Sequence, residues 1–319
     1  MNKITVTSTC YGRILQAVGT RRFNALHILL IAVFLMFSSC ASKDKYDAMQ
    51  KELSDFIEGK DANIGVAVII DGNNTVAVNG NKEFPMLSVY KFPIALAFAE
   101  HSRQNNLTSD FPIAILPEDL HADTYSPMTE KILASGKVVT DTLRMPAIEL
   151  LGYMLQQSDN NASDIVLRYV NGPEYVERYL HGLGINDVNV RSSEAEMHVD
   201  NSLCYANSAT PIGMATLMDK FCSDFDDSIS VDIKRLMETC ETGKNRLPKP
   251  IKNAVIGHKT GTGFVLPGGR LMAVNDAGYI CLPDGHRYSI AVFIENSGLD
   301  MPQTEDLIAQ ISNIVLTHL

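Results

Sequence analysis

The stretch LSVYKFPIALA, residues 87–97, opens the part of the chain that decides its fold. If it begins a helix, Ser88 and Lys91 project from the same side of the first turn, because residues three apart are neighbours on a helix. A lysine amine held away from water beside a second cation can lose its proton, and a helix amino terminus stabilises negative charge on a serine oxygen. The stretch therefore predicts a helix that presents Ser88 as a nucleophile. Taken alone, the pattern more often reflects a capping serine followed by a solvated lysine.

Helical patterns dominate the residues that follow this stretch. Apolar periodicity predicts helices over 145–157, 162–170 and 214–221. Thr210-Pro211 places a capping residue before a proline at the first helical position, which is a strong start signal. We therefore expect residues 87–242 to form an all-helical lobe.

Strand patterns flank this helical part on both sides. The elements predicted there are a helix at 46–57, strands at 64–70, 75–78, 254–258, 271–282 and 287–295, and a closing helix at 304–319. Strands at both ends with helices between them predict an α+β protein, in which residues 44–86 plus 243–319 form one antiparallel sheet flanked by helices. We expect a site in the cleft between this α/β lobe and the inserted helical lobe.

Composition limits the function further. The chain has 319 residues, of which 45% are hydrophobic, so it can bury a large core. Its net charge of -10 argues against a nucleic-acid partner, because phosphate binding needs clustered Lys and Arg. We expect a soluble acidic enzyme or binding domain, and with no sign of an oligomer we expect a monomer.

The six cysteines do not form a metal-binding pattern. No Cys-x-x-Cys pair occurs, and the histidines lack ligand spacing, which argues against a zinc hydrolase and predicts no cofactor. Cys10 and Cys40 belong to the leader, and the others are widely separated. We expect those others to be buried free thiols.

The amino terminus has the pattern of a secretory signal. Four cationic residues precede the apolar run 25–37, which ends in Ser38-Ser39-Cys40 and is too short for a comfortable membrane span. The small residues before Cys40 resemble a bacterial lipoprotein cleavage site, although Phe37 departs from the usual aliphatic residue. The sequence leaves three fates of the leader open: lipidation of Cys40, ordinary cleavage, or retention as an uncleaved anchor.

Two further motifs follow at a distance from Ser88. Ser158-Asp159-Asn160 alone is typical of a helix end, and Lys259-Thr260-Gly261 alone is typical of a polar sheet edge. Together with Ser88-Val89-Tyr90-Lys91, and in this order, they resemble the penicillin-recognising serine enzymes, which include class A β-lactamases and penicillin-binding proteins. The resemblance covers nearly the whole mature chain and implies a β-lactamase/transpeptidase-like fold.

Glu194 decides between the branches of this superfamily. It lies before Thr210, where class A enzymes carry the glutamate that activates water to clear the acyl-enzyme. Glu196 is a rival base two residues on, and both acids are also compatible with a solvated loop. The resemblance favours Glu194, because His198 then falls where the family usually has an asparagine that helps hold the water.

Further residues resemble the Bacteroides-type class A group, which consists largely of cephalosporinases. The resemblance is carried by 158–164, Met197-His198 and Asp276-Ala277-Gly278. It implies that Asp164 holds the glutamate loop by hydrogen bonds to its backbone. Ser192 and Asn207 stand at the approximate places of the usual arginine–aspartate salt bridge, so we expect that tether to be absent.

The resemblance also implies roles for the remaining site residues. Arg246 would bind the substrate carboxylate alongside Lys259 and Thr260, through charge-assisted hydrogen bonds. Tyr125 would be an aromatic gatepost at the cleft mouth, with core packing as the alternative. In the same reading Ser158 passes a proton to the leaving nitrogen, Asn160 binds the substrate's side-chain amide, and backbone amides of Ser88 and Thr262 form the oxyanion hole.

The implied activity is hydrolysis of cephalosporins and penicillins through a serine acyl-enzyme, which confers antibiotic resistance. Leu87 and Gly263 exclude the active-site disulfide of several carbapenem-hydrolysing relatives, so we do not expect carbapenem hydrolysis. The implied location is the periplasm, with membrane contact only through a possible lipid anchor at Cys40. Two alternatives remain: a D-alanyl-D-alanine carboxypeptidase, and a β-lactam sensor that stays acylated and signals through a partner.

Overall fold

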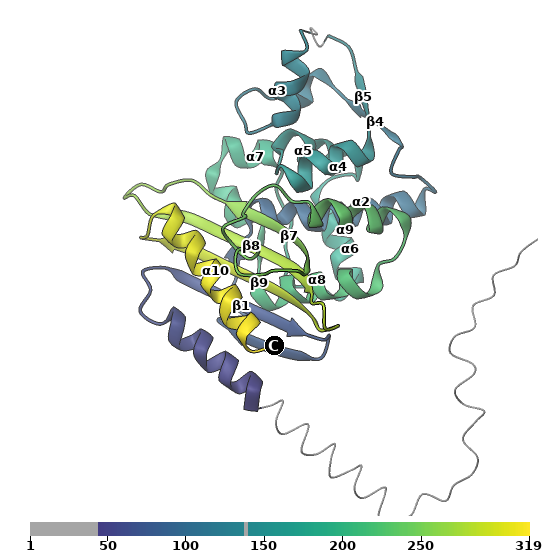
Figure 1. Cartoon of the computed structure of the whole chain (residues 1–319). Coiled ribbons are helices and arrows are strands. Elements are labelled where there is room, and N and C mark those ends of the chain that lie inside the picture. Colours follow the sequence, from purple (N-terminus) through teal and green to yellow (C-terminus); the bar gives the residue numbers. More distant parts are fainter. Residues whose placement is uncertain (1–43, 137–139) are drawn as a thin grey trace, which may run out of the picture. The chain divides into compact units, whose positions relative to one another are not determined.

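The computed structural model describes residues 44–136 and 140–319, and residues 46–319 form one compact unit (Figure 1). The leader with Cys10 and Cys40 lies outside the described residues. Among the residues that are described, no helix is both long and apolar enough to cross a membrane.

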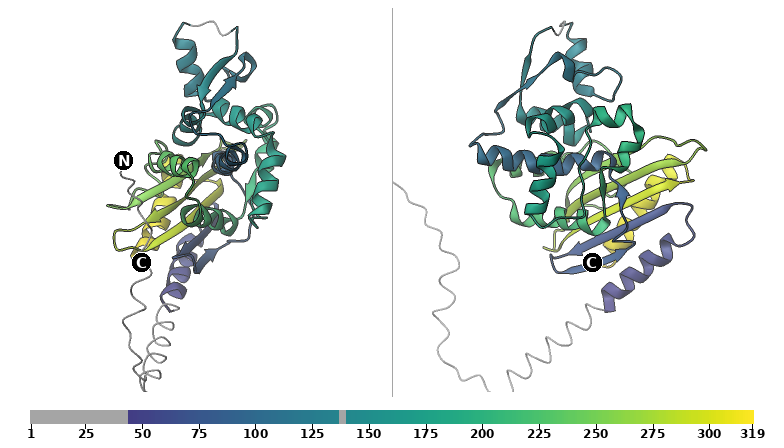
Figure 2. Two further views of the ribbon diagram at one scale, coloured as in Figure 1. Left: turned by 90° about the vertical axis from the view of Figure 1, so that its right-hand side faces the viewer. Right: turned by 180° about the vertical axis from the view of Figure 1, so that it is seen from behind.

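Both ends of this unit contribute strands to one sheet. Its order is β2-β1-β9-β8-β7, with every neighbouring pair antiparallel. The bounds are β1 Asn63–Ile70, β2 Asn74–Val78, β7 Val255–Thr262, β8 Leu271–Cys281 and β9 Arg287–Ser297. Figure 2 shows the early, blue strands beside the late, yellow ones, and in the register Val66 of β1 faces Val292 of β9. The sequence-based expectation of a sheet built from both termini is confirmed.

The two faces of the sheet pack against different helices. Alternate residues of β1 point to opposite faces, so Val66 and Val68 join one core while Ala67 and Ile69 join the other. The first core contains the helix at 44–57 and α10 Met301–Thr317, which crosses the sheet in Figure 1. The second contains α8 Pro211–Asp224 and the helices of the inserted part.

The inserted part is centred on α2 Lys91–Gln104, in which every residue from Lys91 to Ala99 is buried. A helix that is apolar on all sides must be enclosed by its neighbours. The neighbouring helices are α3 Pro127–Ala134, α4 Ala147–Gln156, α5 Asn160–Tyr169, α6 Pro173–Gly182, α7 Glu194–Val199 and α9 Ser228–Glu238. Thr210 caps α8 by accepting a hydrogen bond from Gly213 N, as the sequence predicts.

Residues 87–242 are not all-helical as expected, because they contain three short strands, one of which pairs with a strand just before this part. The pairs are β3 Phe84–Pro85 with β6 Ser208–Ala209, and β4 Pro112–Ile115 with β5 Leu143–Pro146. Strands of two to four residues are too short to show a period, so their pairing depends on contacts between distant segments. Three 3-10 turns complete the elements: η1 Leu87–Tyr90, η2 Pro117–Asp119 and η3 Asn201–Tyr205.

Most predicted boundaries differ from the structure by one to three residues, and two differences concern the segments around Ser88 and Lys259. The helix expected to begin at Leu87 begins instead with the 3-10 turn η1 and becomes α-helical at Lys91. The strand predicted to end at His258 continues to Thr262, because Lys259 and Thr262 pair with Ala277 and Val274 of β8. A polar segment has no apolar alternation to reveal such pairing in the sequence.

Candidate active site

Ser88 lies in the tight turn that leads from β3 into α2. Leu87 just before it has a φ of 47°, in the left-handed region that non-glycine residues rarely adopt. Ser88 is the one residue of η1 that is not buried, whereas Lys91 is fully buried. Lys91 Nζ donates a hydrogen bond to Ser88 Oγ at 2.8 Å, so the turn brings the two side chains together.

Lys91 joins three separate elements. Besides Ser88 Oγ, its amine donates to Asn160 Oδ1 of α5 at 2.8 Å and to the Glu194 Oε1 carboxylate oxygen of α7. An ammonium group has three donors, and these three acceptors use all of them. A proton can therefore pass between Ser88, Lys91 and Glu194 without large movement of any side chain.

Ser158 and Lys259 form a second pair on the opposite side of Ser88. Lys259 Nζ donates to Ser158 Oγ at 2.9 Å and to Thr260 O at 2.9 Å. Burial, together with the nearby charges of Lys91 and Arg246, lowers the pKa of Lys259 to about 7. Ser158 itself, at the junction between α4 and α5, has a φ of 64°, in the left-handed region.

Asp159 holds this junction from inside. Its buried carboxylate caps α5 by accepting from Ala162 N at 2.8 Å, and it also accepts from Met128 N and from Ser126 Oγ. Asn160 Nδ2 donates to Thr124 Oγ1 at 2.8 Å. The loop at 124–128 is thus fixed against the segment that carries Ser158 and Asn160.

Glu194 is the first residue of α7, and Asp164 secures that end of the helix. The two carboxylate oxygens of Asp164 accept from Glu194 N and Ala195 N, each at 2.8 Å. Burial raises the pKa of Asp164 to about 6, against the opposite effect of these two hydrogen bonds. The pairing is the one that the family resemblance implied for Asp164.

The rival base Glu196 points elsewhere. Glu196 Oε2 accepts from Ser193 N at 2.8 Å and from Ser193 Oγ at 3.1 Å, which completes a capping box at the start of α7. Glu196 is exposed, whereas Glu194 is only partly so and contacts Lys91. Glu194 therefore belongs to the site around Ser88, and Glu196 does not.

Asn207 secures the glutamate loop in a way that the sequence analysis missed. Its buried side chain accepts from Arg191 N at 2.7 Å and Ser192 N at 3.0 Å, and it donates to Ser192 O at 2.9 Å. Ser192 and Asn207 carry no charge, as expected, yet an amide clamp to the backbone connects them. An amide side chain that both donates and accepts was the available signal for such a clamp.

Strand β7 presses against the turn that carries Ser88. A Cβ atom placed on Gly261 would lie 2.4 Å from Met86 O and 3.3 Å from Ser88 N, so only glycine fits here. Gly263 N donates to Ala273 O of β8, and successive N–H groups of a strand point to opposite sides. The N–H of Thr262 therefore points to the open edge of β7, which is the edge that adjoins Ser88.

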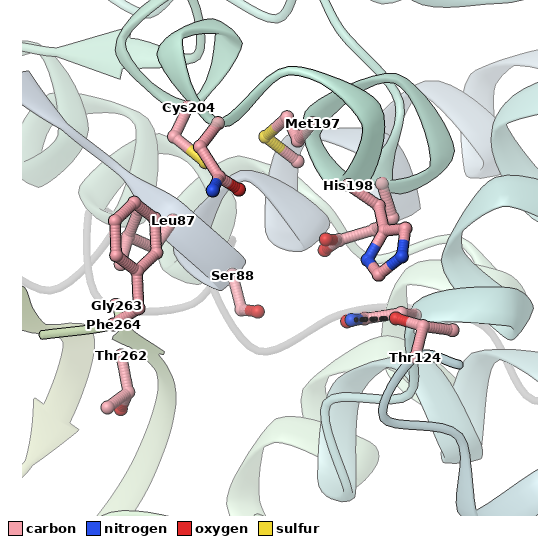
Figure 3. A pocket seen from close by; sticks show the side chains of 12 residues that line it. Leu87, Ser88, Thr124, Met197, His198, Cys204, Thr262, Gly263 and Phe264 are labelled. Atoms are coloured by element: carbon pink, nitrogen blue, oxygen red, sulfur yellow. Dashed lines mark hydrogen bonds between the residues drawn. The ribbon is translucent and has the colours of Figure 1, made fainter.

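Ser88 faces two cavities. The first, of about 350 Å³, is also lined by Glu194, His198, Thr262 and Phe264, and Figure 3 shows His198 and Thr124 across the hollow from Thr262. The second, of about 300 Å³, is lined by Ser88 together with Tyr125, Ser158, Asn160, Thr242, Arg246, Thr260 and Thr262. Both cavities are of the size that binds small molecules.

Tyr125 and His198 lie at the rims of these cavities. Tyr125 is 58% exposed, which excludes the alternative that it packs in the core. His198 follows Glu194 by one turn of α7, and its Nε2 lies 3.0 Å from Asp123 Oδ2. Both residues can therefore meet a ligand in the cavity that each lines.

Arg246 is largely occupied by protein partners. Its guanidinium forms an ion pair with Glu305 at 3.0 Å and donates to the carbonyl oxygens of Gly261 and Asn275. Its remaining hydrogen bond goes to Thr262 Oγ1 at 2.7 Å. The arginine thus supports the end of β7 and reaches the second cavity beside Thr262.

No cluster of His, Cys, Asp and Glu side chains that could hold a metal ion occurs in the part of the chain that the structure describes.

Comparisons with known proteins identify the family of the chain. A family model described as the beta-lactamase enzyme family matches residues 48–319. A beta-lactamase of Phocaeicola vulgatus is 33% identical, covering 92% of this chain and 94% of its own length, and one of Bacteroides uniformis is 31% identical, covering 92% and 98%. The solved structure of a representative class A beta-lactamase from Bacteroides cellulosilyticus superposes with a TM-score of 0.79 and 31% identity, covering 87% of this chain and 98% of that one.

Proposed function

Because the chain belongs to the beta-lactamase enzyme family, as a class A serine β-lactamase, it hydrolyses β-lactams, and we propose that it does so through a Ser88 acyl-enzyme that Glu194 clears. Hydrolysis of these antibiotics confers resistance to them. One observation carries the assignment of residues: the buried Lys91 amine contacts Ser88 Oγ, Asn160 Oδ1 and the Glu194 carboxylate at the same time.

In the first step Ser88 Oγ attacks the lactam carbonyl carbon. Its proton leaves through Lys91, or through a water molecule to Glu194, and the contact between Lys91 and Glu194 is compatible with both routes. Backbone N–H groups of Ser88 and Thr262 bind the developing oxyanion, where one donor is typically worth about 100 to 1000-fold in rate. Ser158, bonded to Lys259, passes a proton to the leaving nitrogen as the ring opens.

In the second step Glu194 takes a proton from a water molecule that attacks the acyl ester carbon. The ester bond to Ser88 Oγ breaks, the opened lactam leaves as a carboxylic acid, and Ser88 recovers its proton. Asp164 and the Asn207 clamp support this step by holding the backbone of the glutamate loop. His198 lines the same cavity as Glu194 and would help to hold the water.

The second cavity suits the anionic part of a β-lactam. Lys259, Thr260 and Thr262 bind the substrate carboxylate in this proposal, and Arg246 contributes through its hydrogen bond to Thr262. Asn160 binds the amide of the substrate side chain, and Tyr125 stands at the rim. Cephalosporins and penicillins, which share this carboxylate and amide, are the proposed substrates.

The lobe assignment is part of the same proposal. Ser88, Lys91, Ser158 and Glu194 come from residues 87–242, whereas Lys259 to Thr262 come from the lobe formed by 44–86 plus 243–319. Catalysis would thus take place between the two lobes. We further propose a monomer exported to the periplasm by its leader, with Cys40 as a possible lipid attachment site.

Stopped-flow hydrolysis of a chromogenic cephalosporin tests this mechanism against the two alternatives. We expect many product molecules per enzyme molecule, because Glu194 is in place to regenerate Ser88. A single burst, stoichiometric with enzyme, would contradict the proposal and favour a carboxypeptidase or a sensor, neither of which needs Glu194 to clear a lactam.

A further inference from the structure

Two cysteines that are 59 positions apart in the sequence meet in the structure. Cys222 lies in the last turn of α8 and Cys281 ends β8, and their Sγ atoms are 4.0 Å apart. Each is half-buried rather than buried, which corrects the expectation of buried free thiols. Solvent and reagents can therefore reach the pair at the surface of the fold.

Two cations surround Cys222. Arg287 stands directly opposite Cys281 in the β8–β9 ladder, and its guanidinium forms an ion pair with Asp219 at 3.5 Å and donates a hydrogen bond to Ser223 Oγ, next to Cys222 in the chain. Lys234 of α9 donates to Cys222 O at 3.0 Å and to Phe225 O at 2.7 Å, which places its charge beside the same residue. Cations near a cysteine stabilise its thiolate, which is the reactive form.

The two thiols differ in acidity as a result. A hydrogen bond from Cys281, with the charges of Arg287 and Lys234, lowers the pKa of Cys222 against the opposing effect of burial. The pKa of Cys281 is raised by that hydrogen bond, by burial and by the negative charge that Cys222 carries. One thiolate beside one thiol is the arrangement that thiol–disulfide exchange uses.

We infer that Cys222 and Cys281 are a dithiol that closes to a disulfide bond between α8 and β8 on exchange with a protein or small-molecule disulfide. The Cys222 thiolate attacks one sulfur of that disulfide and releases its first thiolate. Cys281 then loses its proton and attacks the Cys222 sulfur, which forms the Cys222–Cys281 bond and expels the second thiolate. The protein loses two electrons and the external disulfide becomes two thiols.

Formation of the disulfide requires little movement, and the bond lies away from the active site. A disulfide has a sulfur separation of about 2.05 Å, so the two atoms must approach by about 2 Å, which rotation of a cysteine side chain can provide. Cys281 pairs with Val255, the first residue of β7, whereas Thr262 is the last. At about 3.3 Å per residue, roughly 23 Å of strand separate the cross-link from Thr262.

Peptide mapping of the full chain tests the inference. After incubation with oxidised glutathione, the protein is unfolded in N-ethylmaleimide and digested without reduction. We expect a cross-linked peptide pair containing Cys222 and Cys281, two hydrogen masses below the sum of the reduced peptides, with Cys204 and Cys240 alkylated. Alkylation of both Cys222 and Cys281, or glutathione retained on Cys222 without a cross-link, would overturn the inference.

Matched variants and thermal unfolding extend the test. Cys204→Ser should keep the cross-link, whereas Cys222→Ser and Cys281→Ser should lose it. The oxidised wild-type protein should unfold at a temperature higher by on the order of 10 °C than the reduced protein, because the bond closes a long loop in the unfolded chain. Equal midpoints would contradict the cross-link, and cephalosporin turnover should be the same in both forms.

Discussion

Lys91 is the residue on which the site depends. Its ammonium group is fully buried, and the Glu194 carboxylate neutralises it while Ser88 and Asn160 accept its other hydrogen bonds. Removing one partner of a buried ion pair typically costs roughly 3–5 kcal/mol, because the remaining charge is left uncompensated. The same contacts that stabilise Lys91 therefore hold Ser88 and Glu194, the proposed nucleophile and base, close together.

Glu194→Gln separates the two chemical steps. The amide can keep a hydrogen bond with Lys91 but cannot take a proton from water, so deacylation should slow by roughly 100 to 10,000-fold while acylation remains. Mass spectrometry of the intact protein after mixing with a cephalosporin should show the accumulated acyl-enzyme.

Glu196→Gln is the control for this change. Glu196 is two residues away and caps α7 without contacting Lys91, so the variant should turn over cephalosporin at nearly the wild-type rate. Normal turnover by Glu194→Gln, or an accumulated acyl-enzyme in Glu196→Gln, would show that the base has been assigned to the wrong acid.

The lowered pKa of Lys259 predicts that substrate binding depends on pH. Its pKa, lowered to about 7 by burial and by Lys91, makes the amine charged below this pH and neutral above it. A neutral amine attracts the substrate carboxylate less, so KM for an anionic cephalosporin should rise roughly tenfold from pH 6 to pH 8. The same cephalosporin with its carboxylate esterified should show no such rise, and parallel profiles for acid and ester would refute the role of Lys259.

At the scale of elements, the site is formed where three of them meet. The turn η1 presents Ser88, α7 presents Glu194, and β7 presents Lys259 and the N–H of Thr262. Asp164 ties α7 to α5 through two backbone hydrogen bonds. The distance between β7 and η1 is set by backbone contact at Gly261.

Gly261→Ala tests this contact. The added methyl group would meet Met86 O at 2.4 Å, and a backbone oxygen cannot move aside as a flexible side chain can. We expect a loss of about 1–3 kcal/mol in the free energy of unfolding, the usual cost of overpacking, and a fall in kcat because Thr262 N is displaced from Ser88. Urea unfolding and steady-state kinetics measure the two effects.

Gly182→Ala makes the same chemical change at the end of α6, where an added Cβ meets nothing within 4 Å. Its stability should be unchanged or slightly higher, because alanine favours a helix more than glycine does. Wild-type stability and kcat in Gly261→Ala would disprove close packing of β7 on η1.

At the scale of the whole molecule, the chain closes its sheet by pairing the early strand β1 with the late strand β9. The segment between β2 and β7, which carries Ser88, Ser158 and Glu194, is inserted into this scaffold of strands. A nucleophile on the insertion thus meets a binding strand of the scaffold only when both parts have folded.

The leader determines where this molecule would act. If Cys40 is lipidated, Cys40→Ser should lose the lipid, because the lipid attaches to the cysteine. Incorporation of labelled fatty acid into the wild-type protein, and not into Cys40→Ser, measures the modification directly. Equal labelling of both proteins, or no labelling of the wild-type protein, would exclude a lipid anchor at Cys40.

Local spacing in the sequence was enough to predict most of the regular elements and the family. Apolar periods of two and of three to four residues located the strands and helices of the sheet and of α4, α5, α8 and α10. The order of the motifs at Ser88, Ser158 and Lys259 indicated the family and its fold. Local patterns carry this information because each helix turn and each strand residue repeats a fixed geometry.

The folded structure, and not local spacing, sets which distant residues pair. It selected Glu194 over Glu196 by placing one carboxylate against Lys91 and the other against Ser193. It extended β7 through its polar end, gave Arg246 the partner Glu305, and brought Cys222 to Cys281. These contacts join segments tens to hundreds of residues apart. Their energies depend on burial and on the loss of alternative partners, and local spacing in the sequence predicts neither.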